Sequence, residues 1–258
     1  MISLENFDRS LDILVNGRLV RNYARARLFG KERLGLYPSL FMLSLWNIPE
    51  DEYLLLSRAH EITIKHGEII LASGAVADVF RYSERKGTEV QVAFSPGLML
   101  WGSSVSLDVE AGTRVSEIVS QLLDRSEAGV ELLSFPGEDP IVTRGQAFFG
   151  RASECIEEIL SKAEARCCLV PSGLCVIPKN GLPVSMVLTE EDLTEPPFFT
   201  CGPELVLRTG PAGWTLGKHI EYRYGWAKGR GLIEERMLNL DTDDSTWMVE
   251  LLVTNYES

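Results

Sequence analysis

The spacing between apolar residues changes twice along this chain, and that change constrains the fold more than any single motif. Through residues 1–110 apolar positions alternate in short runs, which is typical of strands that bury one face. Between residues 111 and 188 two segments show helical spacing instead. Short alternating runs return after residue 189. The sequence therefore predicts an α+β protein that is mainly β, with a helix-bearing middle.

The first 110 residues are predicted to form a small β-barrel or sandwich. Asn16-Gly17 lies between two apolar runs and indicates a hairpin, because both central residues of such a turn need positive φ. Further strands are expected at residues 41–46, 61–66, 69–72, 75–82 and 90–94. The acidic cluster at residues 49–52 is predicted to be a solvated turn.

The middle is predicted to be a helix–strand–helix–hairpin unit over residues 111–188. Apolar residues within 114–125 form one stripe of an amphipathic helix: Val115, Ile118, Val119, Leu122 and Leu123. Thr113 is the expected N-cap of this helix. A strand at 130–133, a second helix at 152–166, and a hairpin joining 167–170 to 174–177 are expected to complete the unit.

Residues 189–258 are predicted to form a linker and a second small β-barrel. Acidic residues at 189–193 and the pair Pro196-Pro197 indicate the linker. Strands are expected at 204–208, 219–224, 232–238 and 247–254. The predicted architecture is therefore two small β-barrels, residues 1–110 and 189–258, bridged by an α/β subdomain at 111–188.

The glycine-rich basic segment 225–231 lacks the Gly-Lys-Ser/Thr ending and the following helix of a phosphate-binding loop. We therefore predict a flexible β-loop. The alternative is a contact loop for an acidic partner.

Charge and composition narrow the classes of function. The net charge of −12 and the pI near 4.8 argue against binding nucleic acid, which requires clustered Lys and Arg. Solubility explains this charge, and a channel wall that repels nucleic acid is the alternative. The sequence contains no apolar run of about 20 residues, so no membrane span is predicted. Charged residues within 1–14 are incompatible with the apolar core of a signal peptide.

No catalytic, cofactor-binding or metal-ligating residue is predicted. His60, His66 and His219 are too few and too dispersed for a zinc site. Adjacent Cys167 and Cys168 would point to opposite faces of a strand. The odd number of cysteines, which also include Cys155, Cys175 and Cys201, predicts reduced thiols in a cytoplasm. No cysteine has a histidine beside it in the sequence that would support a nucleophilic pair.

The remaining polar and aromatic clusters have structural interpretations first. The acidic runs at 190–192 and 241–244 are expected to be solvated turns, because the second lacks the glycine and glutamate of a calcium-binding loop. Core packing is the expected role of the C-terminal aromatics Trp214, Tyr222, Tyr224 and Trp226. An interface is the alternative, because Tyr and Trp are enriched there.

Four segments occur in an order that is similar to a known family. They span residues 59–68, 72–80, 88–95 and 109–119, and the last joins Gly112-Thr113 to the start of the first helix. This order resembles the baseplate hub proteins of phage tails, the late control protein D family, and the related spike proteins of type VI secretion. The resemblance covers most of the chain, although the C-terminal third matches the family's second barrel only loosely.

The resemblance implies a structural, non-enzymatic role. In such a hub, three copies would form a ring of six barrels. One face of the ring would match a sixfold tail tube or distal tail protein, and the other a threefold spike or tail tip. The lumen would line the DNA path, with the tape measure protein as a further partner. The protein would be assembled in the host cytoplasm and located in the virion tail, without membrane insertion or specific nucleic-acid binding.

Two other classes of function stay open from the residues. A hydrolase would need a cysteine and a histidine, or two carboxylates, brought together by the fold. Another virion module, such as a tube, distal tail or glycan-binding protein, would need a single barrel or exposed aromatics around a groove.

Overall fold

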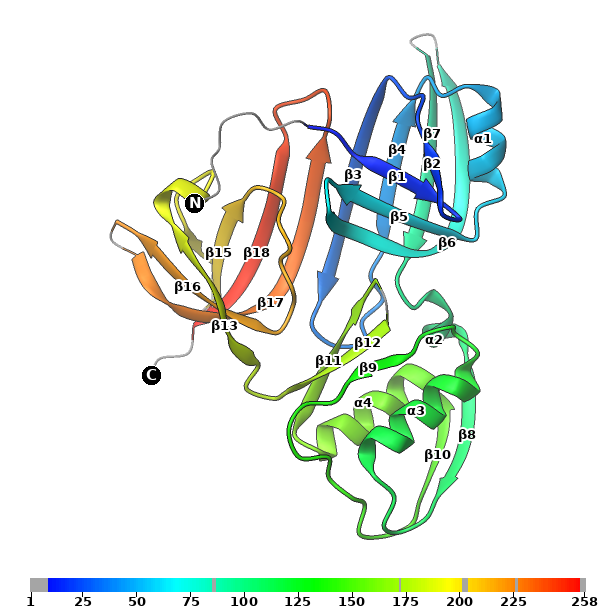
Figure 1. Cartoon of the computed structure of the whole chain (residues 1–258), viewed down its shortest axis with the longest axis vertical. Coiled ribbons are helices and arrows are strands. Elements are labelled where there is room, and N and C mark those ends of the chain that lie inside the picture. Colours follow the sequence, from blue (N-terminus) through cyan, green and yellow to red (C-terminus); the bar gives the residue numbers. More distant parts are fainter. Residues whose placement is uncertain (1–8, 85–86, 172, 201–203, 226, 256–258) are drawn as a thin grey trace.

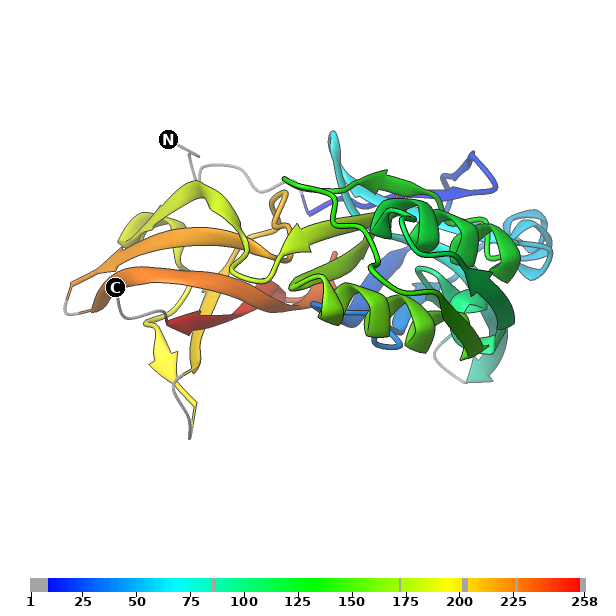
Figure 2. The ribbon, with the colours of Figure 1, turned by 90° about the horizontal axis from the view of Figure 1, so that it is seen from below.

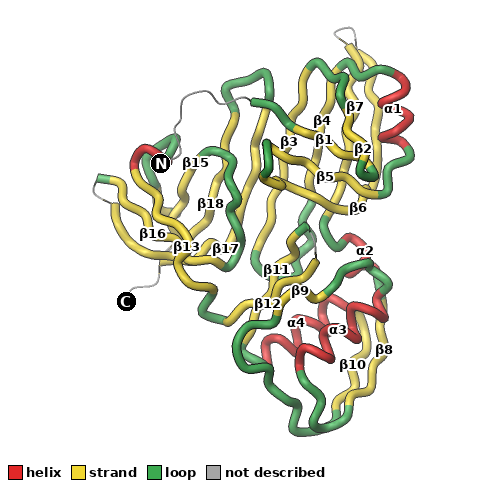
Figure 3. Tube along the Cα trace, viewed as in Figure 1, coloured by secondary structure: helices red, strands yellow, loops and turns green. Residues whose placement is uncertain are grey.

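The computed structural model describes residues 9–84, 87–171, 173–200, 204–225 and 227–255 (Figure 1). It is an α+β structure dominated by strands, which confirms the predicted class. Three of the α-helices lie together in the lower part of the molecule, and α1 lies apart from them (Figure 3). Cys201, Trp226 and the first eight residues lie outside the described residues.

The N-terminal part is a curved arrangement of antiparallel strands. It comprises β1 (Asp12–Val15), β2 (Arg18–Val20), β3 (Arg25–Arg33), β4 (Phe41–Trp46), α1 (Glu50–Ser57), β5 (Glu61–His66), β6 (Ile69–Glu84) and β7 (Gly87–Ser95). The β1–β2 hairpin confirms the predicted turn, with Asn16 and Gly17 at φ 49° and 77°. Strand order is β3-β4-β7-β6-β5-β1-β2.

Residues 69–82 were predicted to form two strands, and this was wrong. They lie in the single long strand β6, which pairs with β5 through its first half and with β7 through its second. Gly74 lies at the change of partner, where an added Cβ would be 2.3 Å from the carbonyl carbon of Ser95. The absent side chain therefore lets two backbones approach closely, and the glycine marks a bend.

Two elements of this part were missed. Strand β3 was not predicted because it buries few apolar side chains, chiefly Ala26 and Leu28, between charged residues. The predicted acidic turn at 49–52 is instead the start of α1. Its carboxylates lie in the first turn, where the helix dipole favours negative charge, and Leu56 is buried beneath it.

The middle of the chain packs helices against two small sheets. It comprises α2 (Leu98–Gly102), β8 (Ser104–Val109), α3 (Val115–Ser126), β9 (Leu132–Ser134), β10 (Gln146–Arg151), α4 (Ala152–Lys162), β11 (Ala165–Val170) and β12 (Gly173–Pro178). Strands β8 and β10 pair with each other, and β11-β12-β9 form a three-stranded sheet. The predicted apolar stripe of α3 is fully buried, which confirms this helix.

Details of this unit differ from the prediction. The helix α3 begins at Val115 and its first turn is capped by Asp139, which accepts hydrogen bonds from the Ser116 amide (3.1 Å) and hydroxyl (2.6 Å). Thr113 is not the cap, because its hydroxyl donates to the Glu110 carbonyl. Helix α4 ends at Lys162 rather than 166, and Glu164 has a φ of 49° before β11. Strands β8 and β10 were not predicted.

The C-terminal part comprises β13 (Leu182–Thr189), the 3-10 turn η1 (Glu190–Asp192), β14 (Phe198–Phe199), β15 (Glu204–Thr209), β16 (Lys218–Tyr224), β17 (Ala227–Asp241) and β18 (Trp247–Asn255). Residues expected to form a linker pair with neighbours instead: Leu193 bridges Thr209, and the Thr194 amide donates to the Arg208 carbonyl. Strand β13 pairs with β16, and β14 pairs with β15. Residues 182–200 therefore link the two ends of the strand row β16-β17-β18-β15.

The glycine-rich segment predicted to be a loop is largely strand. Residues 227–232 of β17 pair with β16, and the Tyr222 ring packs where a side chain on Gly229 would lie. The glycines were misread because a missing side chain indicates flexibility in a sequence, whereas here it accommodates a neighbouring ring.

One strand joins the N- and C-terminal parts into a continuous sheet. Along one edge, β17 pairs first with β16 and then, from Glu235 onward, with β3; its other edge pairs with β18. The Gly217 amide donates to the Ile233 carbonyl and the Leu34 amide to the Glu234 carbonyl, so the partner changes between adjacent residues. A shared core lies inside both parts, whereas the α3–α4 unit has its own core.

Candidate assembly surface

The continuous sheet has an outer face that crosses both β parts of the protein. Side chains directly opposite one another cross it in rows, such as Asn239 on β17, Phe29 on β3 and Met42 on β4. Phe29 is 45 % exposed despite its apolar ring. The rows continue onto β7 and β6, where Phe80 and Tyr82 are also exposed and their rings stack 6.5 Å apart.

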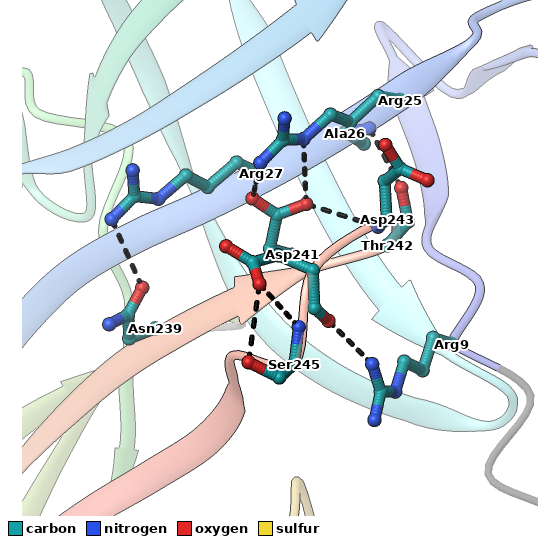
Figure 4. Close-up of polar contacts among 10 residues, drawn as sticks. Arg9, Arg25, Ala26, Arg27, Asn239, Asp241, Thr242, Asp243 and Ser245 are labelled. Atoms are coloured by element: carbon teal, nitrogen blue, oxygen red, sulfur yellow. Dashed lines mark hydrogen bonds and ion pairs between the residues drawn. The ribbon is translucent and has the colours of Figure 1, made fainter.

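Three cations on this face, Arg25, Arg27 and Lys31, have acceptors beside them. Arg25 forms a two-pronged ion pair with Asp241, with 2.8 Å between Nε and Oδ1 (Figure 4). The Arg25 guanidinium also lies over the Trp46 ring. Arg27 donates to the Asn239 amide oxygen at 3.4 Å, also drawn in Figure 4. Lys31 pairs with Glu235 at 2.7 Å. Such pairing lowers the attraction of the face for phosphate groups.

Electrostatics around Asp241 reflect this pairing. Burial of this carboxylate alone would raise its pKa, but hydrogen bonds from Arg25 and from the Asp243 amide lower the pKa below its ordinary value. The acidic turn predicted at 241–244 is therefore only partly solvated, because Asp241 is buried.

A buried ion pair fixes the two β parts to each other. Arg236 on β17 and Glu32 on β3 lie 2.6 Å apart, Nη2 to Oε2, with side chains only 8 % and 13 % exposed. Arg236 also donates to the carbonyls of Leu71 at 2.8 Å and Trp214 at 3.3 Å. Strands β17, β3 and β6 and the loop before β16 thus meet at one guanidinium.

The α3–α4 unit is attached to β17 at Glu234, two residues before Arg236. Arg166 on β11 forms two 2.7 Å contacts with the Glu234 carboxylate. In the β3–β4 loop, the Leu36 amide donates to Glu157 Oε1 on α4 at 2.7 Å, and the Gly35 amide donates to the Cys167 carbonyl at 2.7 Å. These contacts come from residues far apart in the sequence, so no local pattern could have predicted them.

Of the cysteines considered for chemistry, Cys155, Cys167 and Cys168 are buried and Cys175 is half-buried, whereas Cys201 lies outside the described residues. Cys167 and Cys168 do point to opposite faces, each into a different core, as predicted. Burial raises the pKa of Cys168 to about 12 and raises the pKa of Cys167 and, less strongly, of Cys155. Since the thiolate is the reactive form, these cysteines are poor nucleophiles.

The histidines are dispersed. His219 contacts the Leu182 carbonyl at 2.7 Å, whereas His66 contacts the Ser10 carbonyl at 3.0 Å and the edge of Trp247. Within the described ranges, no group of three or more His, Cys, Asp or Glu side chains could hold a metal ion. No helix among the described residues is long and apolar enough to cross a bilayer.

A cleft of about 540 Å³ lies between the β5–β6 turn, the β11–β12 hairpin and the loop before β16. Its lining includes Glu32, Glu61 and Glu68, but Glu32 is already bound by Arg236.

Trp214 and Tyr222, the aromatics predicted to pack in the core, are buried, and Tyr224 is partly buried.

Comparison with known proteins finds solved structures that share this fold, but no match by sequence. No family model matches the chain, and no curated protein matches its sequence. Solved structures do match: a tail protein of Neisseria meningitidis has a TM-score of 0.73 at 11 % identity, covering 95 % of this chain and 96 % of that one. The 43 kDa tail protein of prophage MuSo2 from Shewanella oneidensis has a TM-score of 0.71 at 9 % identity, with the same coverage.

An Escherichia coli type VI secretion component, described as similar to T4 bacteriophage tail proteins, has a TM-score of 0.69 at 12 % identity. The match covers 95 % of the present chain and 77 % of the Escherichia coli chain. The chain therefore has the fold shared by phage tail and type VI secretion proteins, and the fold implied by the sequence resemblance is confirmed.

Proposed function

We propose that this protein is a structural hub of a phage tail or phage-like particle. The observation that carries the proposal is the single sheet that runs through both β parts by way of β17 and β3, in a fold matched over 95 % of the chain by tail proteins. Three copies would place six such β parts in a ring. The ring adapts a sixfold tail tube or distal tail protein to a threefold spike or tail tip.

The outer face of the sheet suits the wall of a DNA channel. Two of its cations, Arg25 and Lys31, are held in ion pairs, and the chain as a whole carries a net charge of −12. Strong phosphate contacts would retain DNA, so a channel wall benefits from their absence. The role is structural, with no catalysis and no specific nucleic-acid binding; the tape measure protein is a further expected neighbour.

We divide the protomer into a first β unit of residues 1–110, an α/β insert of 111–188, and a second β unit of 189–258. The pairings of β8 with β10 and of β13 with β16 offer a test of these limits. Expression of 111–188 alone should give a folded insert only if β8 is dispensable, which helical circular dichroism reports.

The proposed function is tested on purified tail particles. Quantitative mass spectrometry is expected to find the protein at three copies per particle, half the number in one sixfold ring of tube protein. Labelled antibodies should mark the end of the tail in electron micrographs. Particles that contain no copies, or a protein found along the whole tube, would refute the hub assignment.

A further inference from the structure

Strand β10 of the α3–α4 unit has a free edge. It pairs with β8 from Gln146 to Arg151 without a register shift, and no other strand among the described residues joins this sheet. One face of the two strands is buried in the core of the unit by side chains such as Phe148. The opposite face is open to solvent, and Phe149 on that face is 88 % exposed. No other large apolar side chain of the described residues is as exposed.

The backbone of Phe149 points away from β8. The Ala152 amide donates to the Ser103 carbonyl directly across the ladder, so these two residues form a hydrogen-bonded pair. In an antiparallel ladder such pairs alternate with non-hydrogen-bonded pairs, which places Ala147, Phe149 and Arg151 in the second kind. Their N–H and C=O groups therefore lie along the free edge of β10. No described residue hydrogen-bonds to the backbone of Ala147 or Phe149.

The other edge of this sheet, on β8, is protected. By the same alternation the Ser106 carbonyl points outward, and it accepts a hydrogen bond from the Arg125 guanidinium on α3. Proteins usually protect an edge strand in this way, or with a charge, a proline or a bulge, because an open edge can pair with another chain. Residues 146–150 of β10 contain none of these features. The free edge of β10 can therefore accept one more strand.

Cations lie at both ends of this edge. Arg151 is the last residue of β10, and Arg144 lies two residues before its start. Arg144 forms no ion pair with a described residue, and Arg151 reaches only Glu154, at 3.4 Å between two exposed side chains. Asp108, on the same face of the sheet, belongs to β8, the strand away from the free edge. A segment with acidic ends therefore complements the edge, whereas a basic segment is repelled.

The position of the edge favours a different protein as its partner. Figure 1 shows β8 and β10 at the lower right, and Figure 2 shows their unit from below, in green, on the side away from the C-terminal strands. This sheet is separate from the one that joins the two β parts, so the inference does not rest on the proposed ring. A second copy of β10 fits poorly, because residues 144–151 contain two arginines and no acidic residue.

We propose that an extended, acidic segment of a partner protein adds to β10 as a third strand. Its backbone pairs with the outward N–H and C=O groups of Ala147 and Phe149. One of its apolar side chains packs beside the Phe149 ring, as cross-strand neighbours do. Carboxylates at its two ends meet Arg144 and Arg151.

Peptide binding to the full chain tests the third strand. The probe is a short fluorescein-labelled peptide of alternating Val and Thr with Glu at each end, and its counterpart has Lys at each end. Ala147→Pro removes an outward N–H and breaks no hydrogen bond to β8. Ser106→Pro is the matched control, because it removes an outward N–H from the opposite edge. Phe149→Ser removes the exposed ring, and circular dichroism verifies that every variant folds.

Wild type and S106P should bind the acidic peptide at least ~10-fold more tightly than the lysine-ended peptide. A147P should lose at least ~10-fold in affinity for the acidic peptide, because its edge lacks a donor. F149S should also bind more weakly, with an unchanged denaturant midpoint because the ring is exposed. Hydrogen exchange of residues 146–151 should slow when the acidic peptide is bound.

Equal affinity for the two peptides would overturn the proposal, as would an acidic peptide that binds A147P and F149S as tightly as wild type. Absence of binding at millimolar peptide would overturn it as well. Light scattering that finds wild type dimeric and A147P monomeric would assign the edge to a second copy instead. None of these outcomes decides the hub function, which depends on the copy number in tail particles.

Discussion

Arg236 and Glu32 form an ion pair between two strands, 204 residues apart in the sequence, whose side chains are almost completely buried. The pair lies where β17 leaves β16 and joins β3, and Arg236 also binds two carbonyls from other segments. Burying two charges has a high desolvation cost, so this pair is better understood as fixing the relative position of the β parts than as a source of stability.

Removing one partner should therefore be severe. Glu32→Gln leaves the Arg236 guanidinium buried without a counter-charge and should lower the free energy of unfolding by about 3–5 kcal/mol. Replacing both together, Glu32→Leu with Arg236→Met, should recover most of the loss. Denaturant unfolding at pH 7 measures both. A loss below about 1 kcal/mol for E32Q would show that the pair is hydrated and structurally minor.

The ion pair of Asp241 with Arg25 predicts a pH dependence. The pKa of Asp241 is lowered in the folded state, so its contribution is fully present above the unfolded value of 3.8 and is lost as the pH falls through the lower folded pKa. Between about pH 5 and pH 2, stability should fall more steeply for wild type than for Asp241→Asn. Exposed Asp124→Asn serves as the control and should keep the wild-type slope. Equal slopes for all three proteins would contradict the assigned role.

The sequence predicts those parts of the fold in which side-chain pattern and backbone conformation agree. The stripe of α3 and the Asn16-Gly17 hairpin are such cases, since each signal is contained within a few residues. Strand β3 was missed because its inner face uses Gly30 against the Phe41 ring, and a glycine gives no apolar signal. The Arg236–Glu32 contact could not be predicted, because it exists only after the two β parts have joined.

The division between loops and strands follows the same reasoning. Gly74, Gly229 and Gly231 indicate turns in the sequence, but each lies inside a paired strand where a neighbour occupies the space of a side chain. The acidic run at 50–52 indicates a turn by composition, but its position before a buried Leu56 makes it the start of α1. Composition does not identify conformation here, and it does not fully identify exposure either, because Glu52 in this run is buried.

Buried cysteines should be silent toward thiol reagents in the native protein. The thiols of Cys155, Cys167 and Cys168 are buried, so a reagent cannot reach them. The pKa of Cys168 is also raised to about 12, so the reactive thiolate form of this residue is scarce at pH 7. Brief labelling with a maleimide at pH 7, followed by peptide mass spectrometry, should leave these three unmodified. Protein unfolded in guanidinium should be labelled at all of them. Rapid native labelling of Cys168 would indicate opening of the β11–β12 hairpin.

The bend of β6 gives the sharpest test of the fold. Gly74→Ala would place a Cβ 2.3 Å from the Ser95 carbonyl carbon and 2.5 Å from the Pro96 nitrogen, both backbone atoms that cannot rotate away. Strands β6 and β7 must then separate locally, and we expect destabilisation of about 3 kcal/mol or more.

Gly102→Ala is the matched control, because nothing lies within 4 Å of its added Cβ and its φ is not in the left-handed region. Denaturant midpoints should fall clearly for G74A and stay within about 0.5 kcal/mol of wild type for G102A. A G74A protein as stable as wild type would mean that β6 does not pass this closely over the end of β7, and the continuous course of that strand from β5 to β7 would have to be abandoned.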